Sequence, residues 1–257
     1  MKIGIFGATG TIGSRILKEA VHRQTRPISR ERIAERAKQI WLHNGSPEGT
    51  AESDWARAES ELEAARGADH QVTAFVRDAS RIPADHQGAK WVVADLFDTN
   101  RVAEVIAGQD VVISSYGPAR GGDPHLVVKA AHAVLEAFGR RPGLRVIVVG
   151  GAGSLEVAPG KTVIDAGLIP EEFLPIPKAA KQALGLFRAN HKVSWTYFSP
   201  AALIRPGERT GKFRLGNDQL VVGADGKSTI SCEDYALAMI DEAEHPLHIQ
   251  KRFTIGY

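Results

Sequence analysis

Short apolar runs, rich in β-branched residues, recur along the chain at intervals that leave room for a helix between them. They cover residues 2–6, 72–76, 91–94, 111–114, 145–149 and 194–198. Runs that are apolar on successive residues, without polar alternation, are typical of strands buried on both faces. The intervening stretches 13–21, 99–107, 125–138 and 179–190 have helical character. This alternation predicts an α/β fold with a doubly wound parallel sheet.

Residues 24–68 interrupt the alternation, because they contain no strand candidate and are dense in Arg, Glu and Ala. Apolar residues of this segment fall on two helical faces: Ile33, Ala37, Ile40 and Trp41 on the first, and Trp55, Ala58 and Leu62 on the second. Residues 44–49, with two glycines and a proline, indicate a turn between the helices. The sequence therefore predicts a helical hairpin inserted between the first helix and the second strand.

Composition and charge exclude several classes of protein. The chain has 257 residues, 32 Lys and Arg against 30 Asp and Glu, and a formal net charge of +2. No block of five or more basic residues occurs, so we expect no nucleic-acid partner. The single Cys232 has no companion for a disulfide or a metal, and the nine His form no ligand pattern. These residues therefore predict no metal site. The chain also has no run of about 18 apolar residues, so we expect no membrane contact and a cytoplasmic protein.

A glycine pattern follows the first strand directly and opens the first helix. Gly7 permits a tight turn, Gly10 lets the backbone approach a pyrophosphate, and Gly13 lets helix and strand pack closely. The start of the helix offers backbone N–H groups and a partial positive charge to phosphates. The pattern predicts a dinucleotide-binding loop, with a purely structural turn as the alternative.

The end of the second strand bears on the choice between NADP(H) and NAD(H). An acidic residue there accepts a hydrogen bond from the ribose 2′-OH of NAD, whereas an arginine accommodates the 2′-phosphate of NADP. Arg77 holds the first position, Asp78 is adjacent, and Arg81 follows one helical turn later. We therefore favour NADP(H) over NAD(H), although an arginine at a strand end is also a common solvated residue.

The ends of the later strands should flank the same ligand, because ligands of open α/β sheets lie outside the carboxyl ends of the strands. Asp95 ends the third strand and could contact the adenine side or simply cap the next helix. Residues 149–154 after the fifth strand are a run of small residues. They predict a gap where a nicotinamide ring and a planar substrate could stack, with a plain glycine-rich loop as the alternative.

Four stretches carry a family resemblance: GATGTIG, VVISSYGP, VIVVGGAGSLEVAPG, and WTYFSPAALIRPGERTG with the sequence that follows it. They are similar to the NADH-flavin reductase family, a branch of the atypical short-chain dehydrogenase/reductase superfamily. The resemblance implies one NAD(P)-binding Rossmann domain over residues 1–257, with a small C-terminal substrate lobe at 202–257. It also implies cofactor contacts at Gly7, Thr9, Gly10, Thr11, Ile12, Gly13, Arg77, Asp95, Leu96, Ser114, Tyr116, Gly117, Gly150, Gly151, Ala152, Ser199, Pro200 and Ala201.

The inserted hairpin has a resemblance of its own. Residues 32–62 are similar to a small bacterial helical domain whose function is unknown, which supplies no activity. We expect Trp41 and Trp55 to pack between its two helices. Its role stays open between a docking surface, for a protein partner or for self-association, and a rim over the adenosine end of the cofactor.

A missing pair of residues constrains the chemistry. Classical members of the superfamily use a Tyr with a Lys four residues later as the proton donor to a carbonyl, and none of the four tyrosines here has a Lys at that spacing. Tyr116, Lys178 and Lys181 are weak candidates for a catalytic acid. Reduction of a flavin or a quinone is less demanding, because the acceptor ring can take its proton from water.

The sequence thus favours an NAD(P)H-dependent reductase, an oxidoreductase that transfers hydride to a small planar acceptor such as a flavin or a quinone. An NAD(P)-binding redox sensor that regulates a partner without turnover is the alternative from another class. Sugar-nucleotide epimerase or dehydratase chemistry is a third hypothesis, weakened by the absent Tyr-Lys pair.

Overall fold

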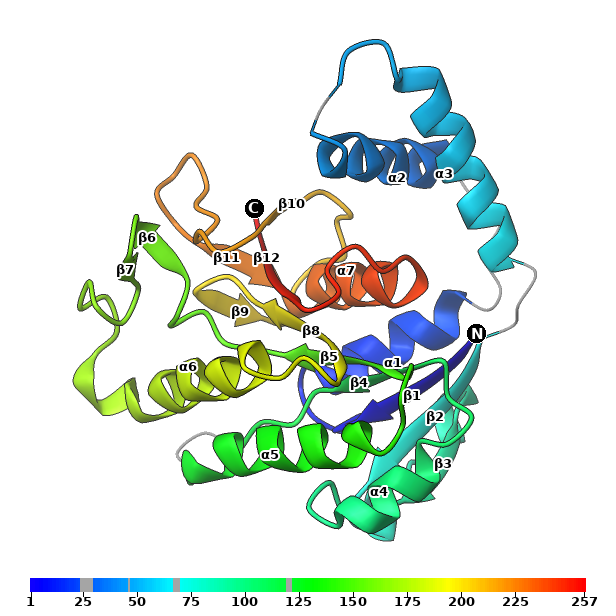
Figure 1. Ribbon diagram of the computed structural model, residues 1–257, viewed down its shortest axis with the longest axis vertical. Coiled ribbons are helices and arrows are strands. Elements are labelled where there is room, and N and C mark those ends of the chain that lie inside the picture. Colours follow the sequence, from blue (N-terminus) through cyan, green and yellow to red (C-terminus); the bar gives the residue numbers. More distant parts are fainter. Residues whose placement is uncertain (24–29, 46, 67–69, 119–121) are drawn as a thin grey trace.

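The computed structural model describes residues 1–23, 30–45, 47–66, 70–118 and 122–257. Its core is an eight-stranded sheet in the order β10-β12-β8-β5-β4-β1-β2-β3 (Figure 1). The strands are β1 (Lys2–Phe6), β2 (Gln71–Val76), β3 (Lys90–Val93), β4 (Val111–Ser114), β5 (Arg145–Val149), β8 (Ser194–Ser199), β10 (Arg214–Gly216) and β12 (Lys251–Gly256). Only β10 is antiparallel to its neighbour. The predicted doubly wound parallel sheet is confirmed.

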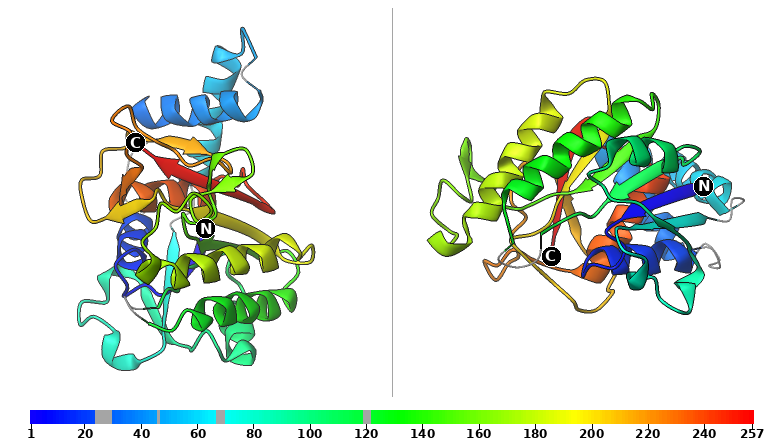
Figure 2. Two further views of the ribbon diagram at one scale, coloured as in Figure 1. Left: turned by 90° about the vertical axis from the view of Figure 1, so that its left-hand side faces the viewer. Right: turned by 90° about the horizontal axis from the view of Figure 1, so that it is seen from below.

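Helices cover both faces of this sheet. One face carries α1 (Gly13–His22) and α7 (Cys232–Glu244), and the other carries α4 (Thr99–Val105), α5 (His125–Gly139) and α6 (Pro175–Arg188) (Figure 2). Successive residues of one strand enter opposite clusters: Ile113 packs under α1 and α7, whereas Val112 packs under α4 and α5. This two-sided burial explains why the strands are continuously apolar in sequence.

The segment after β8 partly completes the main sheet. Of its strands, β12 pairs in parallel with β8, and β10 pairs with β12 at the edge of the sheet. Two small pairs lie outside the sheet: β9 (Leu203–Arg205) with β11 (Thr229–Ser231), and β6 (Glu156–Ala158) with β7 (Lys161–Thr162). Short 3-10 turns occur at η2 (Ala79–Arg81), η3 (His86–Gly88) and η4 (Glu171–Phe173). Residues 202–257 therefore contribute β10 and β12 to the main sheet.

The insertion forms the two expected helices, α2 (Arg30–His43) and α3 (Ala51–Arg66), which lie beyond α7 in Figure 1. Ile33, Ala37, Ile40 and Ala58 are buried between them, and Trp55 packs against this cluster. The prediction for Trp41 is wrong. Its side chain is 37% exposed, and its indole Nε1 donates a hydrogen bond of 2.8 Å to the carbonyl oxygen of Pro47 in the turn. The side chain of Leu62 lies outside the described residues.

Both ends of the insertion are attached to α7 by a buried ionic cluster. Arg23, where α1 ends, donates to Glu19 at 2.9 Å, to Asp241 at 2.8 Å and to Glu244 at 2.6 Å. His70, where the chain returns, lies 2.8 Å from Glu244 through its Nε2 atom. Burial alone would lower the pKa of Arg23, but the three carboxylates outweigh it and raise that pKa. The hairpin therefore starts and ends at the amino edge of the sheet.

In the described part of the chain, no helix is long and apolar enough to span a membrane.

Candidate functional site

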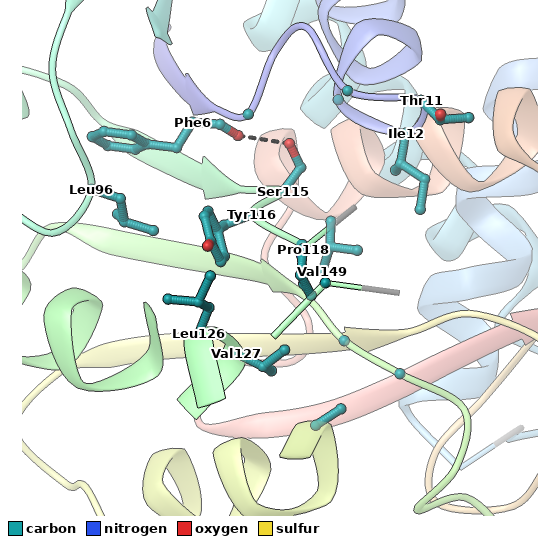
Figure 3. A pocket seen from close by; sticks show the side chains of 18 of the residues that line it. Phe6, Thr11, Ile12, Leu96, Ser115, Tyr116, Pro118, Leu126, Val127 and Val149 are labelled. Atoms are coloured by element: carbon teal, nitrogen blue, oxygen red, sulfur yellow. Dashed lines mark hydrogen bonds between the residues drawn. The ribbon is translucent and has the colours of Figure 1, made fainter. Parts of the chain in front are cut away.

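A cavity of about 790 Å³ opens at the carboxyl ends of the central strands (Figure 3). Its lining comes from the turns that follow β1, β2, β3, β4 and β5, and from the first half of α6. The predicted residues among its lining are Gly7, Thr9, Gly10, Thr11, Ile12, Gly13, Arg77, Asp95, Leu96, Tyr116, Gly117, Gly150, Gly151 and Ala152. None of the described residues of α2 or α3 lines it, so these helices give no support to the alternative of a hairpin rim over the adenosine end.

The glycine turn between β1 and α1 leaves open space beside the backbone of Gly10, which we call the pyrophosphate cradle. Gly7 has a φ of +75°, which favours glycine, and a Cβ on Gly13 would overlap the carbonyl oxygen of Gly7. A Cβ on Gly10 would meet only that same oxygen, at 3.3 Å, so its other side faces the cavity. No side chain caps the start of α1. Free N–H groups beside a bare backbone suit a pyrophosphate, so the turn fits a dinucleotide.

Two arginines line the cavity beyond the end of β2, while the neighbouring acid does not. Arg77 and Arg81 both reach the cavity wall. The carboxylate of Asp78 accepts a hydrogen bond of 2.9 Å from the backbone N–H of Ser80 and caps η2. The hydrogen bonds from Ser80 hold the pKa of Asp78 below its usual range. The carboxylate of Asp78 is thus bound to the backbone of its own turn. The guanidinium groups of Arg77 and Arg81 are therefore available to a phosphate at this end of the cavity.

Asp95 lines the cavity and does not cap the next helix. Its carboxylate accepts a hydrogen bond of 3.0 Å from the N–H of Phe97. The cap of α4 is Asp98, which accepts from the N–H of Arg101 at 3.0 Å. Leu96 and Phe97 continue the same wall of the cavity. The helix start is thus satisfied by Asp98, and Asp95 belongs to the cavity wall.

Tyr116 lies beside the Asp95 segment. Its ring meets that of Phe97 edge to face, with centroids 5.3 Å apart. Burial raises the pKa of Tyr116, Asp95 and Asp123 raise it further, and Arg77 opposes them. Because the net effect of the described groups is to raise that pKa, Tyr116 is poorly suited to act as an acid at neutral pH.

The turn after β4 differs from its prediction by one residue. Ser114 is buried within the strand and does not line the cavity. Ser115 lines it instead, and its hydroxyl donates a hydrogen bond of 2.6 Å to the carbonyl oxygen of Phe6 (Figure 3). Side chains alternate along a strand, so a residue next to a buried one faces the other side.

The small residues after β5 make room for protein atoms as well as for a ligand. A Cβ on Gly150 would overlap the ring of Tyr197, and one on Gly153 would stand 2.7 Å from the Cβ of Pro177. Tyr197 is buried, and its hydroxyl donates to the carbonyl oxygen of Ala180 at 3.1 Å. Burial raises its pKa. The ring of Tyr197 therefore fills part of the predicted gap, next to Gly150, and forms part of the cavity wall.

Three further predicted contacts lie behind the cavity wall. Ser199, Pro200 and Ala201 are buried and do not line the cavity. The carbonyl oxygen of Phe198, just before them, accepts from the N–H of Gly150 at 2.7 Å. Ser199 is the last residue of β8, and Pro200 and Ala201 follow it; the contribution of β8 to the cavity wall is Tyr197.

The lysine candidates for a catalytic acid point away from the cavity. Helix α6 presents Ile176, Pro177 and Ala180 to it, while Lys178 and Lys181 are exposed. Lys181 lies 3.5 Å from the carboxylate of Asp165. Helical periodicity separates the two sets of residues, and neither lysine lines the cavity.

Sequence reasoning missed the apolar part of the cavity. Its inner end is closed by residues that carry no polar signal: Pro118, Leu126, Val127, Val149, Ile176, Pro177 and Ala180. Apolar residues in helices resemble core residues in sequence, so only their convergence identifies them.

A parallel sheet with an uncapped glycine turn beneath such a cavity defines an NAD(P)-binding protein of the Rossmann class. Within that class the chain belongs to the NAD(P)H-binding family whose sequence pattern matches residues 56–246. Residues 28–64 match a family of proteins of unknown function, and these residues include most of the hairpin.

Solved structures of bacterial proteins share the whole architecture. A provisionally named exported protein from Burkholderia pseudomallei is 38% identical, with a TM-score of 0.72 over 100% of both chains. A provisionally named epimerase from Bacteroides thetaiotaomicron is 35% identical, with a TM-score of 0.75 over 100% of this chain and 96% of that one. A provisionally named NADH-flavin reductase from Streptococcus pneumoniae is 28% identical, with a TM-score of 0.73 over 100% of this chain and 99% of that one.

Proposed function

We propose that the protein is an NADPH-dependent reductase of a planar, largely apolar acceptor, with a flavin or a quinone as the first candidates. The observation that carries this proposal is the chemistry of the inner end of the cavity. Of the described residues that line the cavity, the titratable side chains other than Arg77, Arg81 and Asp95 are those of Tyr116 and Tyr197, and the hydroxyl of Tyr197 already donates to Ala180. Apolar walls suit flat rings that stack, and they offer nothing to a polyhydroxylated sugar.

The cofactor end of the cavity supports NADPH over NADH. Arg77 and Arg81 converge on the wall where the adenosine ribose would lie, and Asp78 is held by Ser80. An arginine binds a phosphate through charge-assisted hydrogen bonds, which a plain ribose hydroxyl cannot match. When bound, NADPH supplies a hydride to the acceptor. The residues of this chain bind the pyrophosphate, receive the 2′-phosphate and exclude water from the stacked rings.

The proton requirement separates this proposal from carbonyl reduction. A carbonyl acceptor needs a positioned acid, a role that typically contributes about 10²- to 10⁴-fold to the rate. Lys178 and Lys181 face solvent, and burial raises the pKa of Tyr116. A flavin or a quinone can collect its proton from water, so positioning is the main contribution of this site. The name given to the Streptococcus relative agrees with this class of acceptor.

The decisive experiment is NADPH and NADH oxidation with FMN, riboflavin and a simple quinone, followed by the absorbance of the reduced nicotinamide. Binding of each dinucleotide is measured in parallel by calorimetry. We expect turnover with a planar acceptor and a preference for NADPH. Tyr116→Phe should retain most of the rate, whereas a loss of about 100-fold would make Tyr116 the acid and favour a carbonyl acceptor. Tight binding without turnover would contradict the proposal and favour a dinucleotide sensor.

A further inference from the structure

A buried arginine stands directly behind the inner end of the cavity. Arg252 lies on β12, and its side chain is only 2% exposed. Its Nη1 donates to the carbonyl oxygen and to the hydroxyl of Ser154, both at 2.9 Å. Its Nε donates to the carboxylate of Asp218 at 2.7 Å, and its Nη2 also contacts that carboxylate. The guanidinium thus joins the end of the 150–154 segment to the loop after β10.

Arg252 and Tyr197 support the two ends of the same segment. They are partners in the register of β12 and β8, so they stand side by side in the sheet. Tyr197 lies beneath Gly150, and Arg252 holds Ser154. Gly151 and Ala152 lie between these supports and line the cavity. Two neighbouring side chains therefore set the position of the backbone that faces the reacting rings.

The arginine is also the link between this segment and the C-terminal part of the chain. Asp218 accepts from Arg252, and its carbonyl oxygen accepts a hydrogen bond of 2.8 Å from the N–H of Glu156. Arg188 of α6 reaches the same carboxylate at 2.7 Å. A buried charge is costly unless every donor is satisfied, so its presence here calls for a role that a hydrophobic residue could not fill.

We propose that Arg252 is a positioning residue. It holds the 150–154 segment in the position that the nicotinamide half of the cofactor and the acceptor require. The inference rests on the proposed reductase function and adds a residue that touches neither ligand. The inference predicts different effects on the binding of the two halves of the dinucleotide. The adenosine half is received by the turn after β1 and by Arg77, which Arg252 does not contact. Only the nicotinamide half should respond to a change at Arg252.

The test compares Arg252→Met, Arg252→Lys and a matched control, Arg140→Met, which removes an exposed arginine paired with Glu136. Binding of 2′,5′-ADP reports on the adenosine half and on folding. Binding of NADPH and kcat with a flavin report on the inner end. We expect Arg252→Met to leave the 2′,5′-ADP affinity unchanged and to lower kcat by about 10- to 100-fold, as misplacement by about 1 Å does elsewhere. Arg252→Lys should recover part of this loss, and Arg140→Met should match the wild type.

Each other outcome overturns the inference. Equal losses for 2′,5′-ADP and NADPH would mean that Arg252 only supports the fold, and no loss would mean that the segment positions itself. If Arg252→Met does not fold, Asp218→Ala and Ser154→Ala are compared instead, since they keep the guanidinium and each remove a side-chain acceptor from it. A wild-type protein that binds 2′,5′-ADP without consuming NADPH would fail the proposed function, whereas a normal wild type with insensitive variants would fail this inference alone.

Discussion

The hydroxyl of Ser115 donates a hydrogen bond of 2.6 Å to the carbonyl oxygen of Phe6, which ties the end of β4 to the end of β1 beneath the glycine turn. A Cβ on Gly13 would stand 2.5 Å from that hydroxyl oxygen and would also overlap the carbonyl of Gly7. A Cβ on Gly10 would meet only the carbonyl oxygen of Gly7, at 3.3 Å, without the overlap found at Gly13. Gly13 is therefore needed for the packing of the turn, whereas Gly10 borders the space for a ligand, and substitutions can separate the two roles.

Gly13→Ala should destabilise the protein, because the added methyl group must displace backbone atoms of the turn. Overpacking of this kind costs on the order of 1–3 kcal/mol, which denaturant unfolding would measure. Gly10→Val should instead leave the unfolding free energy almost unchanged and abolish dinucleotide binding by filling the pyrophosphate cradle. Unchanged NADPH affinity of Gly10→Val in calorimetry would refute the assignment of the turn.

Arg77→Ala should weaken NADPH without weakening NADH. A hydrogen bond to a charged group contributes about 1.5–3 kcal/mol, so we expect a loss of about 10- to 100-fold in NADPH affinity. Calorimetry with both dinucleotides measures the ratio directly, and Arg101→Ala, an exposed arginine on α4, serves as the control. Equal losses for the two cofactors would exclude a role in 2′-phosphate recognition.

Glu19→Gln should destabilise the protein at neutral pH and much less in acid. Burial alone would raise the pKa of Glu19, but hydrogen bonds and charges from Arg209 and Arg23 lower it from 4.5 to about 2. A carboxyl whose pKa is depressed by folding stabilises the fold above its unfolded pKa and loses that contribution as the pH falls towards about 2.

The shift of the Glu19 pKa corresponds to a stabilisation on the order of 3 kcal/mol at neutral pH. Unfolding by denaturant at about pH 7 and about pH 3 would give the difference between wild type and variant at each pH. The difference should shrink in acid. A difference that is independent of pH would show that the ionised form of Glu19 does not stabilise the fold.

Replacement of residues 24–69 by a short linker should leave NADPH binding within about twofold of the wild type, because distant sites contribute almost independently. No described residue of α2 or α3 lines the cavity, and the hairpin joins the fold at Arg23 and His70, at the opposite edge of the sheet. Calorimetry on the shortened chain measures this. A large loss of affinity would reveal a coupling between the hairpin and the site.

Hydrophobic periodicity predicted most of the helices and strands around the main sheet. The strands of the main sheet up to β8 and the helices α1, α4, α5 and α6 lie within a few residues of their predicted positions. The start of α7 is fixed locally, since Ser231 caps it by accepting from the N–H of Asp234 at 2.9 Å. The strand β12 was missed, because its pairing with β8 depends on residues more than fifty positions apart. Local pattern carries no information on such pairing.

The candidate site divides in the same way. The glycine turn, Arg77, Asp95 and residues 150–152 were located from sequence, because each follows a strand at a fixed distance and parallel strands end together. Ser115 took the place expected for Ser114, and Lys178 and Lys181 proved to face solvent. A shift of one residue reverses the direction of a side chain in a strand and turns it by about 100° in a helix, and sequence spacing does not resolve such a shift.

The sequence by itself determined the order of the strands and helices, the turn that receives a dinucleotide and the presence of an inserted hairpin. The tertiary structure alone decided which small residues are small for the protein and which for a ligand. Gly150 lacks a side chain because Tyr197 occupies its space, whereas Gly10 borders the open cavity. It also brought Arg252 beside Tyr197, from the last strand of the chain, to hold the wall of the site. The physical reason is that burial and contact belong to pairs of distant residues, whereas a sequence records only neighbours along the chain.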